Sequence, residues 1–389
     1  MIRIRMSRFL TSITALLMSS ACGPGKPAMK TLPVWTLQEA WRVGGEAEGP
    51  HSFDANFGLG MLPGDTLVHF DYQDERFHLL DRNGSPVRSF GRKGAGPGDL
   101  SDGMGFVVTR SGVIVVNDRG NQRLSRFDAS GTALGSVPLP PRFTMGVRWD
   151  ARLLDDGRLL ERYATIVDSL SHDTVVWVDH ARLWSADLTS SEELNTGSCM
   201  VSPRPAGGHT IRMLTAGGSV VARMLPIPYS GAWFATAVDP AGFVWGQPAR
   251  DSAELRKFPI GQCTASATLP LSADTPTIPQ TVRDSAHEVL ARVAAAGGGA
   301  LPNDLNLPDR YPPFFTLHVD DQHRLWVQKF GAAGQQVVDV FDSTGQAIAR
   351  VDSFPLNARG PLLFRGGRIY GFVTDPDGIK YLVALDIVR

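Results

Sequence analysis

The side chains best placed to do chemistry lie in the turns between predicted strands around residues 90–125. They are two basic residues beside a glycine-rich run and four polar residues in the next turn: Arg92, Lys93, Asp118, Arg119, Asn121 and Arg123. Guanidinium, ammonium and carboxylate groups in exposed turns can bind a polar ligand through charge-assisted hydrogen bonds. The same groups can also tie neighbouring sheets together. For Arg123 and its counterpart Arg76 we favour that structural role, through hydrogen bonds to turn carbonyls or carboxylates.

The glycine-rich run at residues 94–98 lacks the features of a phosphate-binding loop. It has no Gly-Lys-Ser/Thr ending, and turn and strand patterns follow it where such a loop needs a helix. The Gly-x-Ser-x-Gly elbow of serine hydrolases does not occur either. We therefore expect no nucleotide binding. We interpret the run as a connection in which glycine lets two backbones pass closely.

The sequence alone does not assemble a metal site. The nine histidines are scattered along the chain, at His51, His69, His78, His172, His180, His209, His287, His318 and His323. No helical histidine pair with a glutamate occurs, and the acidic pairs Asp155-Asp156 and Asp320-Asp321 lie in predicted turns without a complete calcium loop. We expect no cofactor. One alternative stays open, a single Ca²⁺ in a central channel, where histidines of different repeats can also meet.

The elements that carry these residues repeat with an offset of 47 positions. The shift carries Val68 onto Val115, Asp71 onto Asp118, Arg76 onto Arg123, Asp81 onto Asp128 and Gly84 onto Gly131. A period of about 40 to 50 residues composed of short strands is typical of a blade that stacks on its neighbours to bury its apolar faces. The clearest unit, residues 104–137, contains four predicted strands separated by tight turns. Four strands per repeat indicate a β-propeller.

We predict an all-β fold, a six-bladed β-propeller over residues 34–389. The blades are expected near residues 52–92, 101–137, 145–196, 229–271, 312–354 and 358–389. The last blade has only about three strands, so Val34–Val43 is expected to supply the fourth and to close the ring, which removes exposed sheet edges. Trp245 and Trp326 fall on equivalent strands and are best explained by packing between blades. Residues 197–228 fit poorly and leave a seventh blade as the alternative.

One segment breaks the β pattern. Apolar residues recur there at helical spacing, at Val282, Ala286, Val289, Leu290 and Val293. We predict a helix over about 279–296, with Thr277 as its N-cap and Pro279 in its first turn, ended by the glycines at 297–299. Long insertions in repeat proteins project from one face, which is often the binding face. The alternative is a helix that only covers an apolar patch.

Residues 1–21 have the features of a secretory signal peptide. Three arginines precede an uncharged, mostly apolar run at 9–18 that is too short to span a bilayer, and small residues follow it. The Ser-Ala-Cys sequence that ends at Cys22 resembles the lipobox of bacterial lipoproteins, although Ser19 departs from the leucine that this family prefers. The resemblance implies a lipid on Cys22 and a tether over residues 22–33. Ordinary cleavage after Ala21 is the alternative.

Export would affect the redox state of the remaining cysteines and the net charge of the mature chain. In an oxidising compartment Cys199 and Cys263 either form a disulfide or stay two separate thiols, and their spacing of 64 residues does not decide between these outcomes. Without residues 1–21 the chain keeps 35 basic and 39 acidic residues, a net charge of −4. No basic run stands out, so we expect no nucleic-acid partner.

The segment from Gly94 to Arg123 resembles the NHL repeat. It combines a glycine-rich approach, Gly94–Leu100, a strand that ends at Asp118 and an Asn-x-Arg at Asn121. The resemblance is good over residues 90–131, fair over 44–84 and thin elsewhere. It implies a six-bladed propeller of the NHL/TolB-like kind among exported bacterial proteins, some of which are lactonases, lyases or quinoprotein dehydrogenases. It implies no single activity.

These observations lead to two functional hypotheses. The first is a non-catalytic, lipid-anchored propeller of the bacterial cell envelope that binds a protein, peptide or glycan. The second is a propeller hydrolase or lyase with a metal ion in the central channel. We expect a monomer that meets the membrane only through its N-terminal lipid, with a soluble periplasmic or secreted protein as the alternative.

Overall fold

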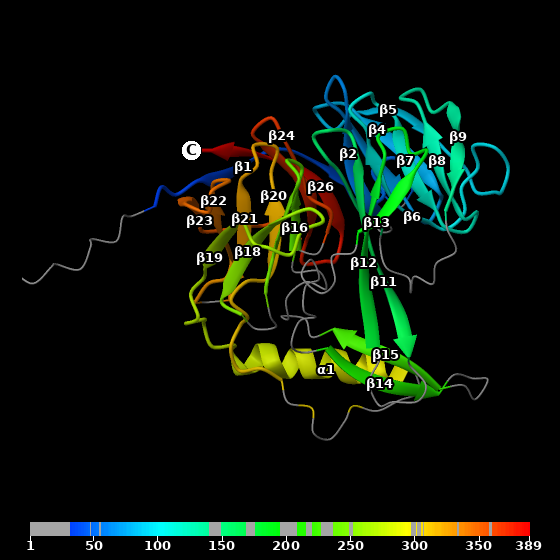
Figure 1. Cartoon of the computed structure of the whole chain (residues 1–389). Coiled ribbons are helices and arrows are strands. Elements are labelled where there is room, and N and C mark those ends of the chain that lie inside the picture. Colours follow the sequence, from blue (N-terminus) through cyan, green and yellow to red (C-terminus); the bar gives the residue numbers. More distant parts are fainter. Residues whose placement is uncertain are drawn as a thin grey trace, which may run out of the picture. The chain divides into compact units, whose positions relative to one another are not determined.

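The computed structural model describes residues 32–46, 48–53, 56–139, 149–168, 176–194, 208–214, 220–226, 236–248, 252–296, 301, 305, 307–332, 334–357 and 360–389. The chain divides into two compact units, Met1–Leu32 and Pro33–Arg389. The predicted signal peptide, Cys22 and all but the end of the tether lie outside the described residues. The second unit is a six-bladed β-propeller (Figure 1).

Six four-stranded antiparallel sheets form the blades within the described residues. Blade 1 consists of β2 (Asn56–Leu62), β3 (Thr66–Asp71), β4 (Arg76–Leu80) and β5 (Pro86–Phe90). Blade 2 consists of β6 (Gly103–Val108), β7 (Ile114–Asp118), β8 (Arg123–Phe127) and β9 (Ala133–Pro138). Blade 3 consists of β10 (Asp150–Leu153), β11 (Leu159–Asp168), β12 (Val176–Trp184) and β13 (Ser191–Leu194).

The other three blades follow the same order. Blade 4 consists of β16 (Thr236–Asp239), β17 (Phe243–Gly246), β18 (Glu254–Pro259) and β19 (Ala267–Pro270). Blade 5 consists of β20 (Thr316–Val319), β21 (Leu325–Phe330), β22 (Gln336–Phe341) and β23 (Ala347–Val351). Blade 6 consists of β24 (Leu363–Arg365), β25 (Arg368–Thr374), β26 (Lys380–Val388) and the N-terminal strand β1 (Thr36–Gly44). Each predicted blade is therefore present, within a few residues of its expected bounds.

The repeated Asp-x-x-Gly sequence forms the turn between the last two strands of a blade. In blade 2 the Asp128 carboxylate accepts hydrogen bonds from the backbone N–H groups of Ser130 and Thr132, at 2.8 and 2.9 Å. Gly131 adopts a left-handed φ of 87°, which favours glycine. Asp81 in blade 1 accepts the same pair of backbone bonds from Asn83 and Ser85. The repeat seen in the sequence is therefore a repeat of turn geometry.

Apolar clusters between neighbouring sheets close the ring. Leu67 of blade 1 and Leu382 of blade 6 share one such cluster, and Phe77 of blade 1 packs with Ile114 of blade 2 in the next. Equivalent clusters join blades 2 and 3, blades 3 and 4, blades 4 and 5, and blades 5 and 6. Each fully buried large apolar side chain stabilises the fold by about 1.5–3 kcal/mol. Both faces of every sheet thus pack against a neighbouring blade, as the stacking of blades requires.

The N-terminal strand supplies the missing strand of the last blade, as predicted. β1 pairs antiparallel with β26, from Thr36 opposite Val388 to Gly44 opposite Tyr381. The residues before β1 also bind blade 5, because the N–H of Trp35 donates to the Arg350 carbonyl of β23 at 2.8 Å. The chain is therefore attached to blades 5 and 6 before it enters blade 1.

Two insertions leave the repeat. Residues 197–228 do not form a seventh four-stranded blade in their described part, which holds the hairpin of β14 (Gly208–Leu214) and β15 (Val220–Pro226). The other insertion contains α1 (Gln280–Ala296), which confirms the predicted helix. In the described part of the chain, no helix has the length and apolar character needed to cross a membrane.

Details of the helix prediction were wrong. Thr277 is not the N-cap, because it forms a β-bridge with Arg310 and the Pro279 carbonyl accepts the first helical bonds. Ala286, Leu290 and Ala294 form the buried face, with Val293 partly buried, whereas Val282 and Val289 are exposed. The partners of the buried face, Tyr311 and Phe330 among others, come from the following loop and from blade 5.

Candidate binding site at the loop-rich end of the blades

The two ends of the blades differ in their connections. In a four-stranded antiparallel meander, the connection between the second and third strands and the link to the next blade leave from one end. We call this the loop-rich end, and the opposite one the tight-turn end. The loop-rich end carries the long hairpin of β11 and β12 and the links that contain β14, β15 and α1 (Figure 1). The sequence-predicted site residues belong to this end as well.

Residues 91–102 form the link between blades 1 and 2. The link folds back on itself, since the N–H of Gly94 donates to the Leu100 carbonyl and the N–H of Leu100 donates to the Arg92 carbonyl, both at 2.9 Å. A Cβ on Gly94 would collide with the carboxylate of Asp99. The glycine-rich run is therefore a close connection between blades, as the sequence predicted.

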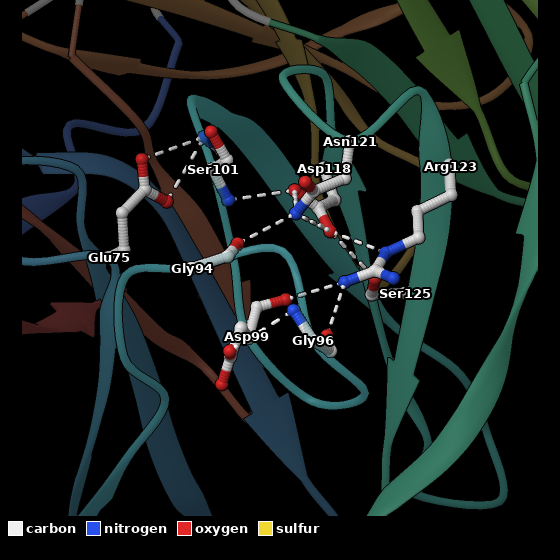
Figure 2. Close-up of polar contacts among 10 residues, drawn as sticks. Glu75, Gly94, Gly96, Asp99, Ser101, Asp118, Asn121, Arg123 and Ser125 are labelled. Atoms are coloured by element: carbon white, nitrogen blue, oxygen red, sulfur yellow. Dashed lines mark hydrogen bonds and ion pairs between the residues drawn. The ribbon is translucent and has the colours of Figure 1, made fainter.

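Asp118 is the centre of the polar network at this link (Figure 2). Its side chain is fully buried at the end of β7. Its carboxylate accepts four kinds of donor: the Ser101 N–H at 2.8 Å, the Asn121 amide at 2.9 Å, the Arg123 Nε at 2.8 Å and the Ser125 hydroxyl at 3.0 Å. Its oxygens are thus used to join the link to the second and third strands of blade 2.

Arg123 extends the network to the glycine-rich run. Its Nη2 donates to the Gly96 carbonyl at 2.9 Å and to the Asp99 carbonyl at 2.8 Å (Figure 2). The predicted role of this arginine as a tie through turn carbonyls and a carboxylate is therefore observed. Arg76, its counterpart at the start of β4, is exposed and makes no bond of this kind to the part of the chain that the structure describes. The repeat thus conserves the position but not the contact.

The other three predicted residues stay at the surface. Arg92 has 77% of its side chain exposed and donates from Nε to Asp99 Oδ1 at 2.5 Å. This hydrogen bond raises the pKa of Arg92 and lowers that of Asp99. Arg119 pairs with Asp102 at 2.5 Å, and Lys93 is exposed. Ligand binding by these side chains stays a prediction.

Glu75 ties blade 1 to the first strand of blade 2. Both of its carboxylate oxygens accept the Gly103 N–H, each at 3.1 Å. The residue is buried, and burial raises the pKa of its carboxyl. Its φ of 54° lies in the left-handed region, as do those of Asp102 and Gln122 nearby. Non-glycine residues with such backbone angles persist only where surrounding contacts hold them.

The tight-turn end contains a group that the sequence did not reveal. His323, in the turn between β20 and β21, places Nδ1 at 2.7 Å from Oδ1 of Asp239 in blade 4. Its Nε2 lies 3.6 Å from Oδ2 of Asp155 in blade 3. The row of polar contacts continues to Lys257, at 3.3 Å from Asp239, and to Arg110 of blade 2, at 2.8 Å from Asp155. Basic and acidic groups from four blades therefore alternate.

One signal for this group was present in the sequence. His323 has a φ of 60°, whereas the equivalent turn positions of blades 2, 3 and 4 are Gly112, Gly157 and Gly242. A histidine at a position where the other blades have a left-handed glycine indicates that its side chain has a role. The acidic pairs noted in the sequence, Asp155-Asp156 and Asp320-Asp321, lie in these same turns.

The described residues bear on the predicted metal site and on the predicted disulfide. Among the described residues, no three histidine, cysteine, aspartate or glutamate side chains are arranged to hold a metal ion. A calcium ion in the central channel thus stays an untested prediction. Cys263 is disulfide-bonded. Cys199, its predicted partner, lies outside the described residues, so the pairing stays a prediction.

Comparisons with known proteins do not assign a family. No family model matches the chain, and no curated protein is a detectable relative. A member of the DUF4221 family from Bacteroides vulgatus is 9% identical, with 92% of this chain and 100% of that chain covered and a TM-score of 0.48. The aldose sugar dehydrogenase of Streptomyces coelicolor in its PQQ-bound form is 11% identical, with 92% and 100% covered and a TM-score of 0.47.

A gluconolactonase from Xanthomonas campestris is also similar in structure. It is 14% identical, with 92% of this chain and 99% of that chain covered and a TM-score of 0.42. Likenesses at these TM-scores carry no argument about activity. The assignment as a six-bladed β-propeller stands on the sheets and clusters of this chain itself, and the resemblance to the NHL repeat stays a prediction.

Proposed function

We propose that this chain is a non-catalytic propeller of the bacterial cell envelope, anchored by a lipid on Cys22. Its loop-rich end binds a protein, peptide or glycan ligand. The observation that supports the proposal is that the polar side chains between residues 91 and 125 fall into two groups, one at least partly buried and one exposed. Asp118, Asn121 and Arg123 are engaged in internal hydrogen bonds. Arg92, which pairs with Asp99, and Lys93 are exposed on the link that these bonds hold in place.

A rigid support for exposed side chains favours binding. The link between blades 1 and 2 has little freedom, because Asp118, Arg123 and its own backbone bonds fix it. Side chains presented on a fixed backbone lose less conformational entropy when they contact a ligand. The long connections at the same end extend the available surface, as binding loops on repeat scaffolds do.

The ligand can be sought with defined probes. Purified protein without its lipid is applied to an array of bacterial envelope glycans and to an array of peptides from envelope proteins. We expect binding in one of the two arrays, weakened at least tenfold in the double variant Arg92→Ala, Lys93→Ala. Absence of binding in both arrays would contradict the proposal.

A matched variant controls for loss of surface charge. Arg158 forms an exposed pair with Asp156 at the tight-turn end, with Nη2 and Oδ2 2.7 Å apart. Arg158→Ala removes a similar ion pair from the opposite end of the blades, so binding should be unchanged. Equal losses in this variant and in the double variant would show that the loop-rich end is not the binding face.

The anchor requires a separate test. In a bacterial host, the mature protein should partition with membranes and carry the mass of acyl chains on an N-terminal peptide that starts at Cys22. Cys22→Ser should release it as soluble protein. A wild-type N-terminal peptide that starts at Cys22 without added mass would support ordinary cleavage instead.

A further inference from the structure

A row of four rings runs along the seam between blades 6 and 1. It begins at His51 in the link between β1 and β2, continues through Phe53 of the same link, and then enters blade 1 at His69 of β3 and His78 of β4. The ring centroids are 6.4, 5.1 and 4.8 Å apart in that order. His69 and His78 face each other across the two strands, with 20° between their ring planes.

The link that carries His51 and Phe53 covers the ring-closing seam. Phe53 packs 5.5 Å from Phe372 of β25 and belongs to the apolar cluster that blades 1 and 6 share. The same link is the covalent connection from the closing strand β1 to the first strand of blade 1. Any displacement of residues 48–53 would therefore expose the apolar seam and loosen the hold on β1.

Histidine hydrogen bonds fasten this link. His69 Nε2 lies 2.8 Å from the Pro50 carbonyl, and a carbonyl only accepts, so this nitrogen carries the hydrogen. His51 contacts the Gly84 carbonyl at 3.1 Å and Glu46 at 3.0 Å. Within blade 1, His78 is joined to the Ser89 hydroxyl at 2.7 Å. The bonds of His69 and His51 join the link to blade 1, and that of His78 joins β4 to β5.

The surroundings disfavour a second proton on the buried rings. Burial, with the neighbouring His78 as a smaller cause, lowers the pKa of His69 to about 3. Burial also lowers the pKa of His78, opposed by Asp71 and Asp74 and aided by Arg76. Among the described residues of the link, Glu46 and the Pro50 carbonyl face the row, and blade 6 contributes the apolar ring of Phe372.

We propose that this histidine row is an acid-sensitive latch on the seam of the ring. At neutral pH the rings stay stacked and hold residues 48–53 down. As the pH falls, protons are taken up by the form in which the link has lifted and His69 is hydrated, and β1 loosens from blade 6. The latch acts through this chain's own residues and does not depend on the proposed ligand.

The size of the effect follows from proton linkage. A buried histidine whose pKa is lowered keeps the closed form fully stable above the ordinary value of 6.5, and that stability is lost as the pH falls towards about 3. For His69 alone, lowering the pH from 7 to 5 should raise the ratio of open to closed forms about twentyfold. Protonation of His78 adds to this change.

Hydrogen exchange tests the latch. Amide exchange of residues 48–53, β1 and β26 is measured by mass spectrometry at pH 7 and pH 5 and corrected for the intrinsic rate, with β20–β23 as internal reference. We expect the seam to exchange about twentyfold faster at pH 5 relative to the reference. An equal response of the seam and the reference in the wild-type protein would overturn the proposal, even if no variant folds.

Two variants locate the effect. His69→Gln keeps an N–H donor for the Pro50 carbonyl and His78→Asn keeps a polar partner for Ser89, but neither side chain titrates. His69→Gln should reduce the acid response of the seam to less than about fivefold, whereas His78→Asn should remove only the contribution of His78 and leave a response of about twentyfold. His287→Gln, which removes an exposed histidine of α1, should leave the response unchanged. A full response in His69→Gln would also overturn the proposal.

Discussion

His323 and Asp239 belong to different blades, and their Nδ1 and Oδ1 atoms lie 2.7 Å apart. Asp239 has only 1% of its side chain exposed and also faces Lys257 of its own blade. His323 holds this contact from a left-handed backbone conformation with a φ of 60°. The imidazole thus stabilises the junction of blades 4 and 5 against the backbone strain at its own position.

Substitutions at His323 separate these two effects. His323→Ala loses the hydrogen bond to Asp239 and keeps the strained backbone, so we expect the free energy of unfolding to fall by about 2 kcal/mol. His323→Gly also loses the bond but relieves the strain, so a fall of about 1 kcal/mol is expected. Urea denaturation measures both. A His323→Ala protein as stable as the wild type would show that the imidazole contributes nothing.

Replacement of Asp118 should destabilise the fold far more than replacement of Asp71, its counterpart in the neighbouring repeat. Asp118→Ala leaves the buried ends of Arg123, Asn121 and Ser125 without their common acceptor, and we expect the free energy of unfolding to fall by about 3–5 kcal/mol. Among the described residues, Asp71 accepts two backbone bonds, from Gln73 and Asp74, so Asp71→Ala should cost about 1 kcal/mol. Urea denaturation of both variants provides the comparison. Equal losses would contradict the central role of Asp118.

The fold was predictable because its information is local and repeated. Each blade needs four short apolar strands and the turns between them, and the turn sequence at Asp81 and Asp128 fixes both the bend and the hydrogen bonds. The closing strand followed from a count of strands in the last blade. The apolar spacing predicted helix α1. It did not predict that Val289 would be exposed, because the partners of the buried face come from elsewhere in the chain.

The site residues were harder to interpret, because their roles depend on contacts across the ring. Asp118 and Arg92 are both charged residues of turns, yet one is fully buried and the other is 77% exposed. Nothing local distinguishes them. His323 and Asp239 lie 84 positions apart, and only the stacking of blades 4 and 5 brings them together. The same holds for the histidine row at the seam.

Trp35 should be essential to the closed ring. The guanidinium groups of Arg324 and Arg389 each lie 5.0 Å from its ring centroid, and the ring of Trp326 lies 6.1 Å away. Trp35→Ala removes this packing and should lower the free energy of unfolding by about 3–5 kcal/mol. Val34→Ala changes a neighbouring residue that is 52% exposed and should have an effect within about 0.5 kcal/mol. Thermal and urea unfolding measure both, and a similar, small effect of the two substitutions would mean that the segment before β1 is not needed for closure.

Glu75 should give the protein a pH dependence opposite in sign to that of an exposed, ion-paired carboxylate. Burial raises its pKa above the ordinary value of 4.5, so the folded state holds this proton more tightly than the unfolded state. The stabilisation is therefore fully present below pH 4.5 and is lost as the pH rises through the raised pKa.

Glu75→Gln cannot titrate, and its amide oxygen can still accept the Gly103 N–H. We expect the melting temperature of the wild type minus that of the variant to decrease between pH 4 and pH 7. The difference cancels contributions from groups that both proteins share, including the seam histidines. A difference that is constant or grows with pH would show that the Glu75 carboxyl is not destabilised by burial in the folded protein.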